Sequence, residues 1–184
     1  MPLFPKPYAD LVQKLRVPIG LVVAASFGWF AHPSALSLLE GLPLAAAGLA
    51  LRAWAAGHLR KNQNLTTSGP YAWVRNPLYV GTLLAVGGCL IAASQPVLAW
   101  VTLAAFVLIY TPVVEQEEQH LRKLFPEYEE YARRVPQFLP RLPRDISERR
   151  FSSAIYRQNK EYKALLGLLW AYAFLVLKAV FAGT

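Results

Sequence analysis

Side chains able to bind or react gather in the stretch GPYAWVRNPLYVG, residues 69–81. Asn76 followed by Pro77 predicts the start of a helix, because asparagine favours the N-cap and proline the first helical position. Such a start leaves free backbone N–H groups that can bind an anion. Arg75 adds a cation directly before it, although aromatic residues at such a place are also typical of a membrane-interface anchor. The residue types by themselves name no reaction.

A second set of such side chains lies in EQEEQHL, residues 115–121. The carboxylates of Glu117 and Glu118 can accept hydrogen bonds from a bound cation, or they can belong to the solvated face of a surface helix. His58 and His120 lack metal-ligand spacing with other ligands, so we predict no metal site.

The elements that must position these residues are apolar helices. Of the 184 residues, 55% are hydrophobic and only 16% are charged, against roughly 25% in soluble globular domains. Helices satisfy their own backbone hydrogen bonds in lipid. We therefore predict an all-α, polytopic integral membrane bundle of about five transmembrane helices with cytoplasmic amphipathic helices. The five apolar runs are Val17–Ala31, Leu42–Gly57, Leu78–Ala93, Val97–Val114 and Ala164–Ala182.

Basic residues flank these runs at alternate ends only. They lie in Lys6–Arg16, His58–Asn76 and Glu115–Lys163, whereas the connections HPSALSLLEG and SQP contain none. The positive-inside rule makes the basic segments cytoplasmic. We predict a multi-pass protein, of the prokaryotic inner membrane, with its N-terminus and active site facing the cytoplasm and its C-terminus outside. The net charge of +8 is then mostly a topology signal, and no nucleic-acid partner is predicted.

The last basic segment contains an amphipathic pattern. Apolar residues recur there at spacings of three and four, which predicts one apolar stripe on a helix. Pro126 falls inside the pattern and predicts a break into two helices, because proline removes a backbone donor and clashes one turn back. The stripe consists of Leu121, Leu124, Tyr128, Tyr131 and Val135.

Taken in order, these motifs closely resemble those of the isoprenylcysteine carboxyl methyltransferase family and the related membrane phospholipid N-methyltransferases. Single pieces are weak, but the ordered set, which covers roughly residues 65–140, is specific. The matching pieces are Gly69-Pro70-Tyr71, Arg75-Asn76-Pro77-x-Tyr79-x-Gly81, Glu117-Glu118-x-x-Leu121, Phe125-Pro126, Tyr128, Tyr131 and Val135-Pro136.

The chain departs from the family pattern at named positions. Asn76 replaces the usual histidine, so a cofactor contact through that imidazole must be remade by an amide or lost. Pro126 replaces the usual glycine. We predict a single integral membrane methyltransferase domain, residues 1–184, whose C-terminal extension at 141–184 carries an extra membrane helix outside the common pattern.

The resemblance implies methyl transfer from S-adenosylmethionine to a lipid-like or prenylated acceptor at the membrane interface, most like carboxyl O-methylation of isoprenylcysteine. The chemistry of the residues agrees, because carboxylates and aromatic faces can hold the ammonium and sulfonium of this cofactor and helix-start amides its carboxylate. The cofactor-binding residues implied are Gly69, Tyr71, Val74, Asn76, Pro77, Tyr79, Glu117, Leu121, Tyr128 and Tyr131.

Arg75 and Glu118 are the predicted catalytic residues. A carboxylate acceptor is already a nucleophile and needs only a cation to orient it, and Arg75 is the candidate. An amine acceptor must lose a proton, and Glu118 is then the candidate base. Arg52 is a costly cation within the second apolar run, and it either snorkels to the interface or faces an internal polar cavity. We favour the cavity, and we predict that Arg52 and Trp73 contact the acceptor.

Other functions fit the same sequence. A phospholipid amine N-methyltransferase would use the same lipid-open cleft, and a non-catalytic scaffold or transport subunit could keep the fold without the cofactor. The sequence does not choose among a carboxylate, an amine and a thiol as the acceptor.

Overall fold

The computed structural model describes residues 4–142 and 150–182, and it confirms the all-α prediction: no strand occurs among these residues. A 3₁₀ turn, η1 (Gly69–Ala72), precedes the third helix, and a π-helical segment, η2 (Phe106–Tyr110), joins the fourth helix to the fifth without a break. The helices are α1 (Lys6–Phe30), α2 (Ala35–Ala56), α3 (Pro77–Ala93), α4 (Pro96–Ala105), α5 (Thr111–Leu124), α6 (Tyr128–Arg134), α7 (Ser153–Gln158) and α8 (Tyr162–Ala182).

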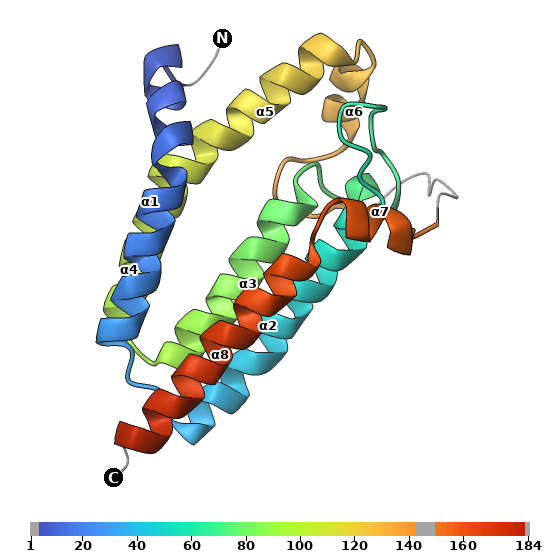
Figure 1. Cartoon of the computed structure of the whole chain (residues 1–184). Coiled ribbons are helices and arrows are strands. Elements are labelled where there is room, and N and C mark those ends of the chain that lie inside the picture. Colours follow the sequence, from blue (N-terminus) through green and yellow to red (C-terminus); the bar gives the residue numbers. More distant parts are fainter. Residues whose placement is uncertain (1–3, 143–149, 183–184) are drawn as a thin grey trace.

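Within residues 4–142 and 150–182, three helices are long and apolar enough to cross a membrane: Ala35–Ala56, Pro96–Leu124 and Tyr162–Phe181. Two further apolar helices, Val17–Phe30 and Pro77–Ala93, are shorter. Each of these five segments overlaps one of the five predicted runs. Two bounds differ: α2 begins at Ala35, inside the predicted connection HPSALSLLEG, and the Pro96 segment extends beyond Val114 to Leu124. The start of α1 and the end of α8 lie at opposite ends of the bundle (Figure 1). The side of the membrane on which each end lies stays a prediction, and the terminal residues 1–3 and 183–184 lie outside the described part of the chain.

Helices α2 and α3 form an antiparallel hairpin, which we call the glycine hairpin, whose backbones touch. A Cβ at Gly48 would overlap the backbone nitrogen of Ala85 and the carbonyl oxygen of Gly81. A Cβ at Gly88 would overlap backbone atoms of α2 at Gly41 and Ala45 in the same way. Small residues let apolar helices approach this closely, which maximises van der Waals contact where no hydrophobic force drives helices together.

The remaining long helices form a second unit, the outer arm, made of α1, α4, η2 and α5. Helix α1 packs on α4, η2 and α5. The Tyr8 hydroxyl donates to the carbonyl of Leu108 inside η2, over 2.7 Å. Helices α1 and α4 diverge from the glycine hairpin and α8 toward the upper end of Figure 1, and α5 leans back over the end of the hairpin. At the lower end, Lys178 of α8 donates from Nζ to the carbonyls of Gly28 and Trp29, over 2.8 and 3.0 Å, and so caps the end of α1.

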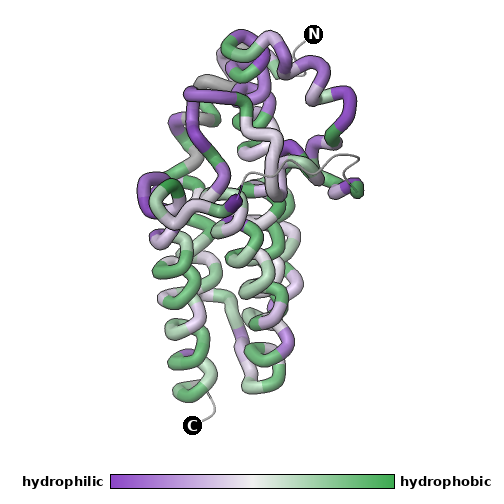
Figure 2. Tube along the Cα trace, turned by 90° about the vertical axis from the view of Figure 1, so that its right-hand side faces the viewer, coloured by the Kyte–Doolittle hydropathy of each residue, from purple (hydrophilic) through white to green (hydrophobic). Residues whose placement is uncertain are grey.

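Hydrophilic residues gather at the end of the molecule where α5, α6 and the 57–76 connection meet, whereas the bundle below is predominantly hydrophobic (Figure 2). The predicted break at Pro126 is confirmed, because α5 ends at Leu124 and α6 begins at Tyr128. Helix α6 folds back toward η1, where the Tyr131 hydroxyl donates to the Tyr71 carbonyl over 2.8 Å. The polar end is therefore a folded cap over the helix ends.

A candidate active site at the polar end of the bundle

The polar end encloses a cavity of about 800 Å³, which we call the polar cavity. It draws its lining from α2, the loop that follows it, η1, the start of α3, α5 and α6, so it depends on the packing of the cap. The lining includes Arg52, Tyr71, Arg75, Asn76, Tyr79, Thr82, Tyr110, Gln116, Glu117, His120, Leu121, Tyr128 and Tyr131, together with Leu59–Asn62 and Asn64–Thr66.

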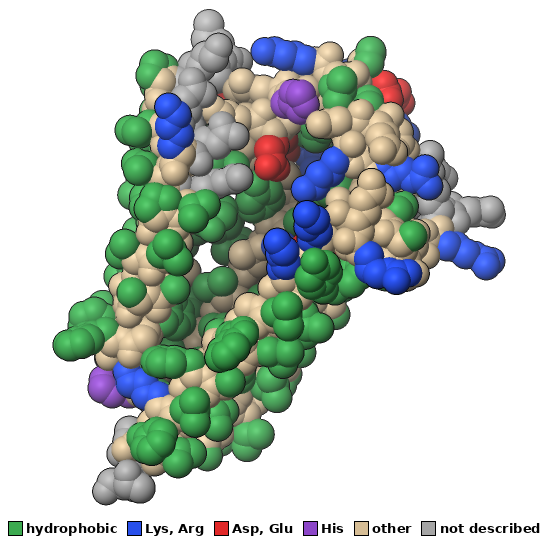
Figure 3. All heavy atoms as spheres, in the orientation of Figure 1, with side chains coloured by type: hydrophobic (Ala, Val, Ile, Leu, Met, Phe, Trp, Pro, Cys, Tyr) green, Lys and Arg blue, Asp and Glu red, His purple; other side chains and the backbone are tan. Residues whose placement is uncertain are grey.

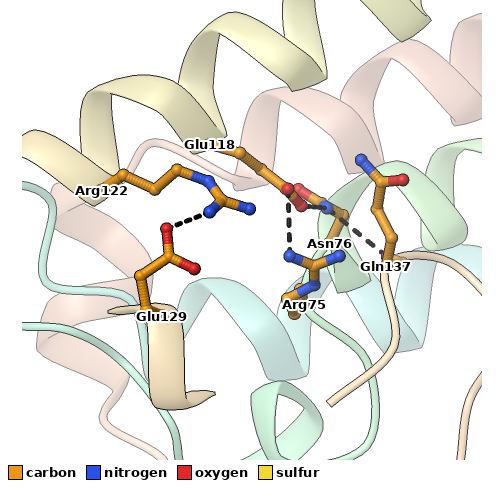
Figure 4. Close-up of polar contacts among 6 residues, drawn as sticks. All are labelled: Arg75, Asn76, Glu118, Arg122, Glu129 and Gln137. Carbon is orange, nitrogen blue, oxygen red and sulfur yellow. Dashed lines mark hydrogen bonds and ion pairs between the residues drawn. The ribbon is translucent and has the colours of Figure 1, made fainter. Parts of the chain in front are cut away.

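Glu118 ties two parts of the cap together (Figure 4). Its Oε2 accepts from Nη1 of Arg75 over 3.0 Å, and its Oε1 accepts from Nδ2 of Asn76 over 3.0 Å. The side chains of Arg75 and Glu118 are only 13% and 10% exposed. Asn76 also donates to the carbonyl of Gln137 over 3.4 Å, and the backbone nitrogen of Arg75 donates to Pro136 over 2.8 Å. A paired, hydrogen-bonded buried carboxylate of this kind fixes the position of its partners.

The predicted helix start at Asn76 is confirmed, but the side chain of Asn76 does not cap the helix. Asn76 occupies the N-cap position of α3 with Pro77 next, yet it makes no side-chain capping hydrogen bond. Its amide is used by Glu118 instead, because the ion pair of Glu118 with Arg75 brings a carboxylate oxygen within reach. The amide therefore stands where the family pattern has an imidazole and serves as a donor between helices.

The two neighbouring glutamates have different surroundings. Glu117 lines the polar cavity, whereas Glu118 is buried behind the wall against Arg75 and Asn76. Both carboxylate oxygens of Glu118 thus accept hydrogen bonds within the protein. A residue held in this way is poorly placed to remove a proton from a ligand in the cavity.

Three tyrosines line the polar cavity from η1 and α6. Burial, and then the charge of Glu117, raise the pKa of Tyr71 well above its usual value. Burial likewise raises the pKa of Tyr131, and it raises that of Tyr128 to about 12. All three phenols therefore stay neutral at physiological pH. The buried hydroxyl of Tyr71 has no hydrogen-bond partner among the described residues, which leaves it available to a ligand.

The structure brings most of the predicted site residues to the wall of this cavity. Those that line it are Arg52, Tyr71, Arg75, Asn76, Tyr79, Glu117, Leu121, Tyr128 and Tyr131. The predicted residues that do not line it are Gly69, Trp73, Val74, Pro77 and Glu118. Gly69 has a positive φ of 60°, and a Cβ there would clash with the ring of His58, so it shapes the turn. Trp73 contributes its carbonyl to the Arg141 backbone, over 3.0 Å.

Arg52 reaches from α2 across α3. Its Nη1 donates to the Leu78 carbonyl over 3.2 Å and to Oγ1 of Thr82 over 2.5 Å. Its Nε donates to Glu161, just before α8, over 2.5 Å. Gly81 makes room for it, because a Cβ at that position would meet Cγ of Arg52. The cation predicted within the second run therefore faces an internal polar site, as expected of a charge at such depth.

A second cavity, of about 620 Å³, lies below the first; we call it the apolar cavity. Its walls come from α1, α3, α4, η2 and α8, and they are made almost wholly of apolar side chains such as Phe27, Val86 and Trp170. Figure 3 shows the face of the molecule hollowed between the α1 side and the α8 side. Thr82 and Tyr110 line both cavities, so the polar and the apolar cavity meet at these two residues.

Sequence reasoning missed the residues at this junction. Thr82 is a single hydroxyl in an apolar run, and Tyr110 reads as one more aromatic residue at a helix end. Their common place follows from η2, where the wider π turn shifts the helix register so that Phe106, Ile109 and Tyr110 all reach a cavity wall. The loop at 59–66 was missed too, although its run of Arg, Lys, Asn and Gln could have suggested a polar lining.

The fold and the site together are those of an all-helical protein with helices apolar enough to cross a membrane and with a polar cavity next to an apolar one. Residues 44–128 match the family model described as phospholipid methyltransferase. This match confirms the resemblance to membrane phospholipid methyltransferases that the motifs show.

Curated relatives are similar over a comparable stretch. The chain is 42% identical to the cobalt-zinc-cadmium resistance protein CzcN of Cupriavidus metallidurans over 118 residues, which are 62% of this chain and 53% of that protein. It is 38% identical to the nickel-cobalt-cadmium resistance protein NccN of Alcaligenes xylosoxydans xylosoxydans over 104 residues, which are 55% of this chain and 47% of that protein. The chain thus spans about half the length of these relatives. No solved structure matches it.

Proposed function

We propose that this protein is an S-adenosylmethionine-dependent methyltransferase that acts on a lipid-like acceptor at the cytoplasmic face of a membrane. The observation that carries the proposal is the junction of the two cavities at Thr82 and Tyr110. A polar cofactor and an apolar tail need different surroundings, and here the two surroundings meet at one place. The family of residues 44–128 supports the reaction type.

The residues of the polar cavity fit this cofactor. Glu117 offers a carboxylate for its ammonium group, and the tyrosine faces of the wall can hold a sulfonium. The hydroxyl of Tyr71, buried and without a partner among the described residues, offers a hydrogen bond at the wall. The start of α3 at Pro77 lies beside the cavity with the positive end of its helix dipole.

When bound, S-adenosylmethionine supplies an electrophilic methyl group: the acceptor's lone pair forms a bond to the methyl carbon while the S–CH₃ bond breaks and its electron pair stays on sulfur. The protein's task in such a displacement is to align the reactants and exclude water. The apolar cavity can hold the acceptor's tail, which leaves the head at the junction beside Arg52 and Thr82.

Arg75 and Glu118 take part in this proposal as a positioning pair. The ion pair fixes the approach of η1 to α5, and Arg75 lines the polar cavity with its buried Nε unpartnered among the described residues. A carboxylate acceptor, as in isoprenylcysteine, and a phospholipid amine stay predictions from the resemblance. A non-catalytic scaffold of the same fold would lack cofactor affinity.

The names of the curated relatives refer to metal resistance. Among residues 4–142 and 150–182, no group of three or more His, Cys, Asp or Glu side chains is placed to hold a metal ion. The cavities support a methyl-transfer reaction more directly.

The test is cofactor binding to the purified full chain in nanodiscs, followed by transfer of labelled methyl groups to extracted lipids and prenyl-cysteine analogues. We expect calorimetry to detect S-adenosylmethionine binding and a labelled lipid product to form. Absence of S-adenosylmethionine binding would contradict the enzyme proposal and favour a non-catalytic scaffold of the same fold.

Arg75→Lys sharpens this test. Lysine keeps the charge but cannot reproduce the planar guanidinium that holds Glu118 while lining the cavity. We expect methyl transfer to fall by about tenfold or more, with membrane insertion preserved. Turnover equal to wild type would remove Arg75 from the site.

A further inference from the structure

A residue from outside the matched segment is linked through Arg52 to the junction of the two cavities. Glu161 lies one residue before α8, beyond the matched residues 44–128, and it is buried at 9% exposure. Its Oε1 accepts from Nε of Arg52 over 2.5 Å. Arg52 in turn donates to Thr82, the hydroxyl that lines both cavities. A chain of contacts thus runs from α8 through α2 to α3 and ends where the cavities meet.

Hydrogen bonds to the end of α2 hold the segment before α8, which carries Glu161, in place. The side chain of Asn159 donates to the carbonyls of Ala56 and Leu59, over 2.9 and 2.8 Å, at the end of α2. The Ser152 backbone donates to the Gly57 carbonyl over 3.1 Å. These contacts satisfy carbonyls that the end of α2 would otherwise leave unpaired, which binds the extension to the helix that carries Arg52.

Glu161 decides the electrostatics of the junction. Arg52 without a partner would present a cation to any head group arriving from the apolar cavity, and its charge would act at short range in a region that is largely shielded from water. With Glu161 at 2.5 Å the pair has no net charge. The second pair at the site, Arg75 with Glu118, is neutral for the same reason. Arg52 and Arg75 are therefore each paired with a carboxylate, whereas the other cations of the polar lining, Arg60 and Lys61, belong to the loop that follows α2.

We propose that Glu161 is a specificity-determining residue of this site: by neutralising Arg52 at the cavity junction, it selects acceptors whose reacting head arrives uncharged and disfavours carboxylates. This inference rests on the proposed function, since it names the substrate class of the same site. It assigns the C-terminal extension a part in acceptor choice, and it argues against the carboxylate that the resemblance to isoprenylcysteine methylation would imply.

The experiment measures acceptor binding, so it needs no turnover. Full-length protein in nanodiscs is titrated with ω-brominated undecanoate and with the matching ω-brominated undecanol, and both are followed by quenching of tryptophan fluorescence, because Trp170 lines the apolar cavity. The two probes share one tail and differ only in the charge of the head. We expect wild type to bind the alcohol about tenfold more tightly than the carboxylate.

Variants of the pair should shift this ratio in opposite directions. Glu161→Gln leaves Arg52 unpaired. We expect the affinity for the carboxylate probe to rise, relative to that for the alcohol probe, by about tenfold or more. Arg52→Gln leaves Glu161 unpaired, so binding of the carboxylate probe should weaken further relative to binding of the alcohol probe. The double variant Arg52→Gln/Glu161→Gln is again neutral and should restore the wild-type preference, which also covers the case in which one single variant fails to fold.

The control is Glu127→Gln, the same chemical change at an exposed position, which should leave the ratio unchanged. A purely structural role for Glu161 would weaken both probes equally and keep their ratio. That result, or a wild-type protein that prefers the carboxylate, overturns the inference. Loss of S-adenosylmethionine binding would contradict the proposed function and would leave the head-group ratio as it is, so the two failures are distinguishable.

Discussion

The glycine hairpin and the outer arm are both built of apolar helices, yet they pack in different ways. In the hairpin, Gly41 and Gly48 of α2 meet Gly88 and Gly81 of α3 with no side chain between the backbones. The outer arm faces the hairpin across the apolar cavity, and its link to α8 at the lower end includes the hydrogen bonds of Lys178. The contact between α2 and α3 is therefore closely packed, whereas a cavity of about 620 Å³ lies between the outer arm and the helices α3 and α8.

The difference teaches which parts of the site are fixed. Arg52, Thr82 and the start of α3 belong to the hairpin, so the polar residues at the cavity junction stand on its tightly packed helices. Tyr110 and Glu117 belong to the outer arm. A ligand that filled both cavities would bind between the closely packed hairpin and the less closely packed outer arm, which would suit the proposed uptake of an acceptor from lipid.

The largest effect should come from filling the hairpin contact. Gly48→Ala places a methyl group against backbone atoms of α3, which cannot rotate away, so the helices must separate. Overpacking of this kind typically costs about 1–3 kcal/mol and occasionally more. We expect a sharp loss of folded protein on heating, measured by fluorescence-detected size exclusion. Gly167→Ala in α8 is the matched control, since its Cβ would meet nothing within 4 Å. Equal thermal stability of the two variants would contradict the proposed rigidity.

A smaller effect is expected where the outer arm contributes to the polar cavity. Glu117→Gln removes the carboxylate that lines the cavity and should weaken S-adenosylmethionine binding by about tenfold, because a charge-assisted hydrogen bond contributes about 1.5–3 kcal/mol. Calorimetry against the exposed Glu127→Gln control measures it. Glu118→Gln should act differently, by loosening Arg75 and Asn76, and so should lower thermal stability as well as affinity. Wild-type affinity in both variants would remove the glutamates from the cofactor site.

Next in size is the connection between the outer arm and α8. Lys178→Met keeps the length of the side chain but removes the donor to the Gly28 and Trp29 carbonyls, at a cost of about 1 kcal/mol. Hydrogen exchange of the last turn of α1 should increase, while exchange in the glycine hairpin stays unchanged. Faster exchange in both regions would show that they do not differ in rigidity.

The smallest effect is a pH dependence at the cap. Burial, and then the charge of Glu118, raise the pKa of Tyr128 to about 12 in the folded protein, above its unfolded value of about 10. The neutral phenol therefore contributes stability that is fully present below pH about 10 and is lost as the pH rises toward 12. In an ultraviolet titration, Tyr128→Phe should show one tyrosine fewer that ionises well above pH 10 than the wild-type protein shows. If Tyr128 ionises near pH 10, the cap is open to water.

Much of the fold could be predicted because its causes are local. The five apolar runs, the helix start at Asn76-Pro77 and the break at Pro126 follow from composition and from proline geometry, which act within a few residues. The ordered motifs led to the family for the same reason. The sequence could not predict that Glu117 lines the cavity while Glu118 pairs with Arg75 and Asn76. Neighbouring residues on a helix point about 100° apart, and only the packing of the helix decides which of them faces the cavity.

The sequence by itself determined an apolar helical chain, its basic flanks and a family motif, since each of these depends on residue types at short spacing. Only the tertiary structure decided which polar groups act together. Arg52 and Glu161 are far apart in the chain, and so are Thr82 of α3 and Tyr110 of the π-helical segment η2, which line both cavities. Contacts of this kind depend on how helix faces meet, and that is set by packing against the glycines of α2 and α3.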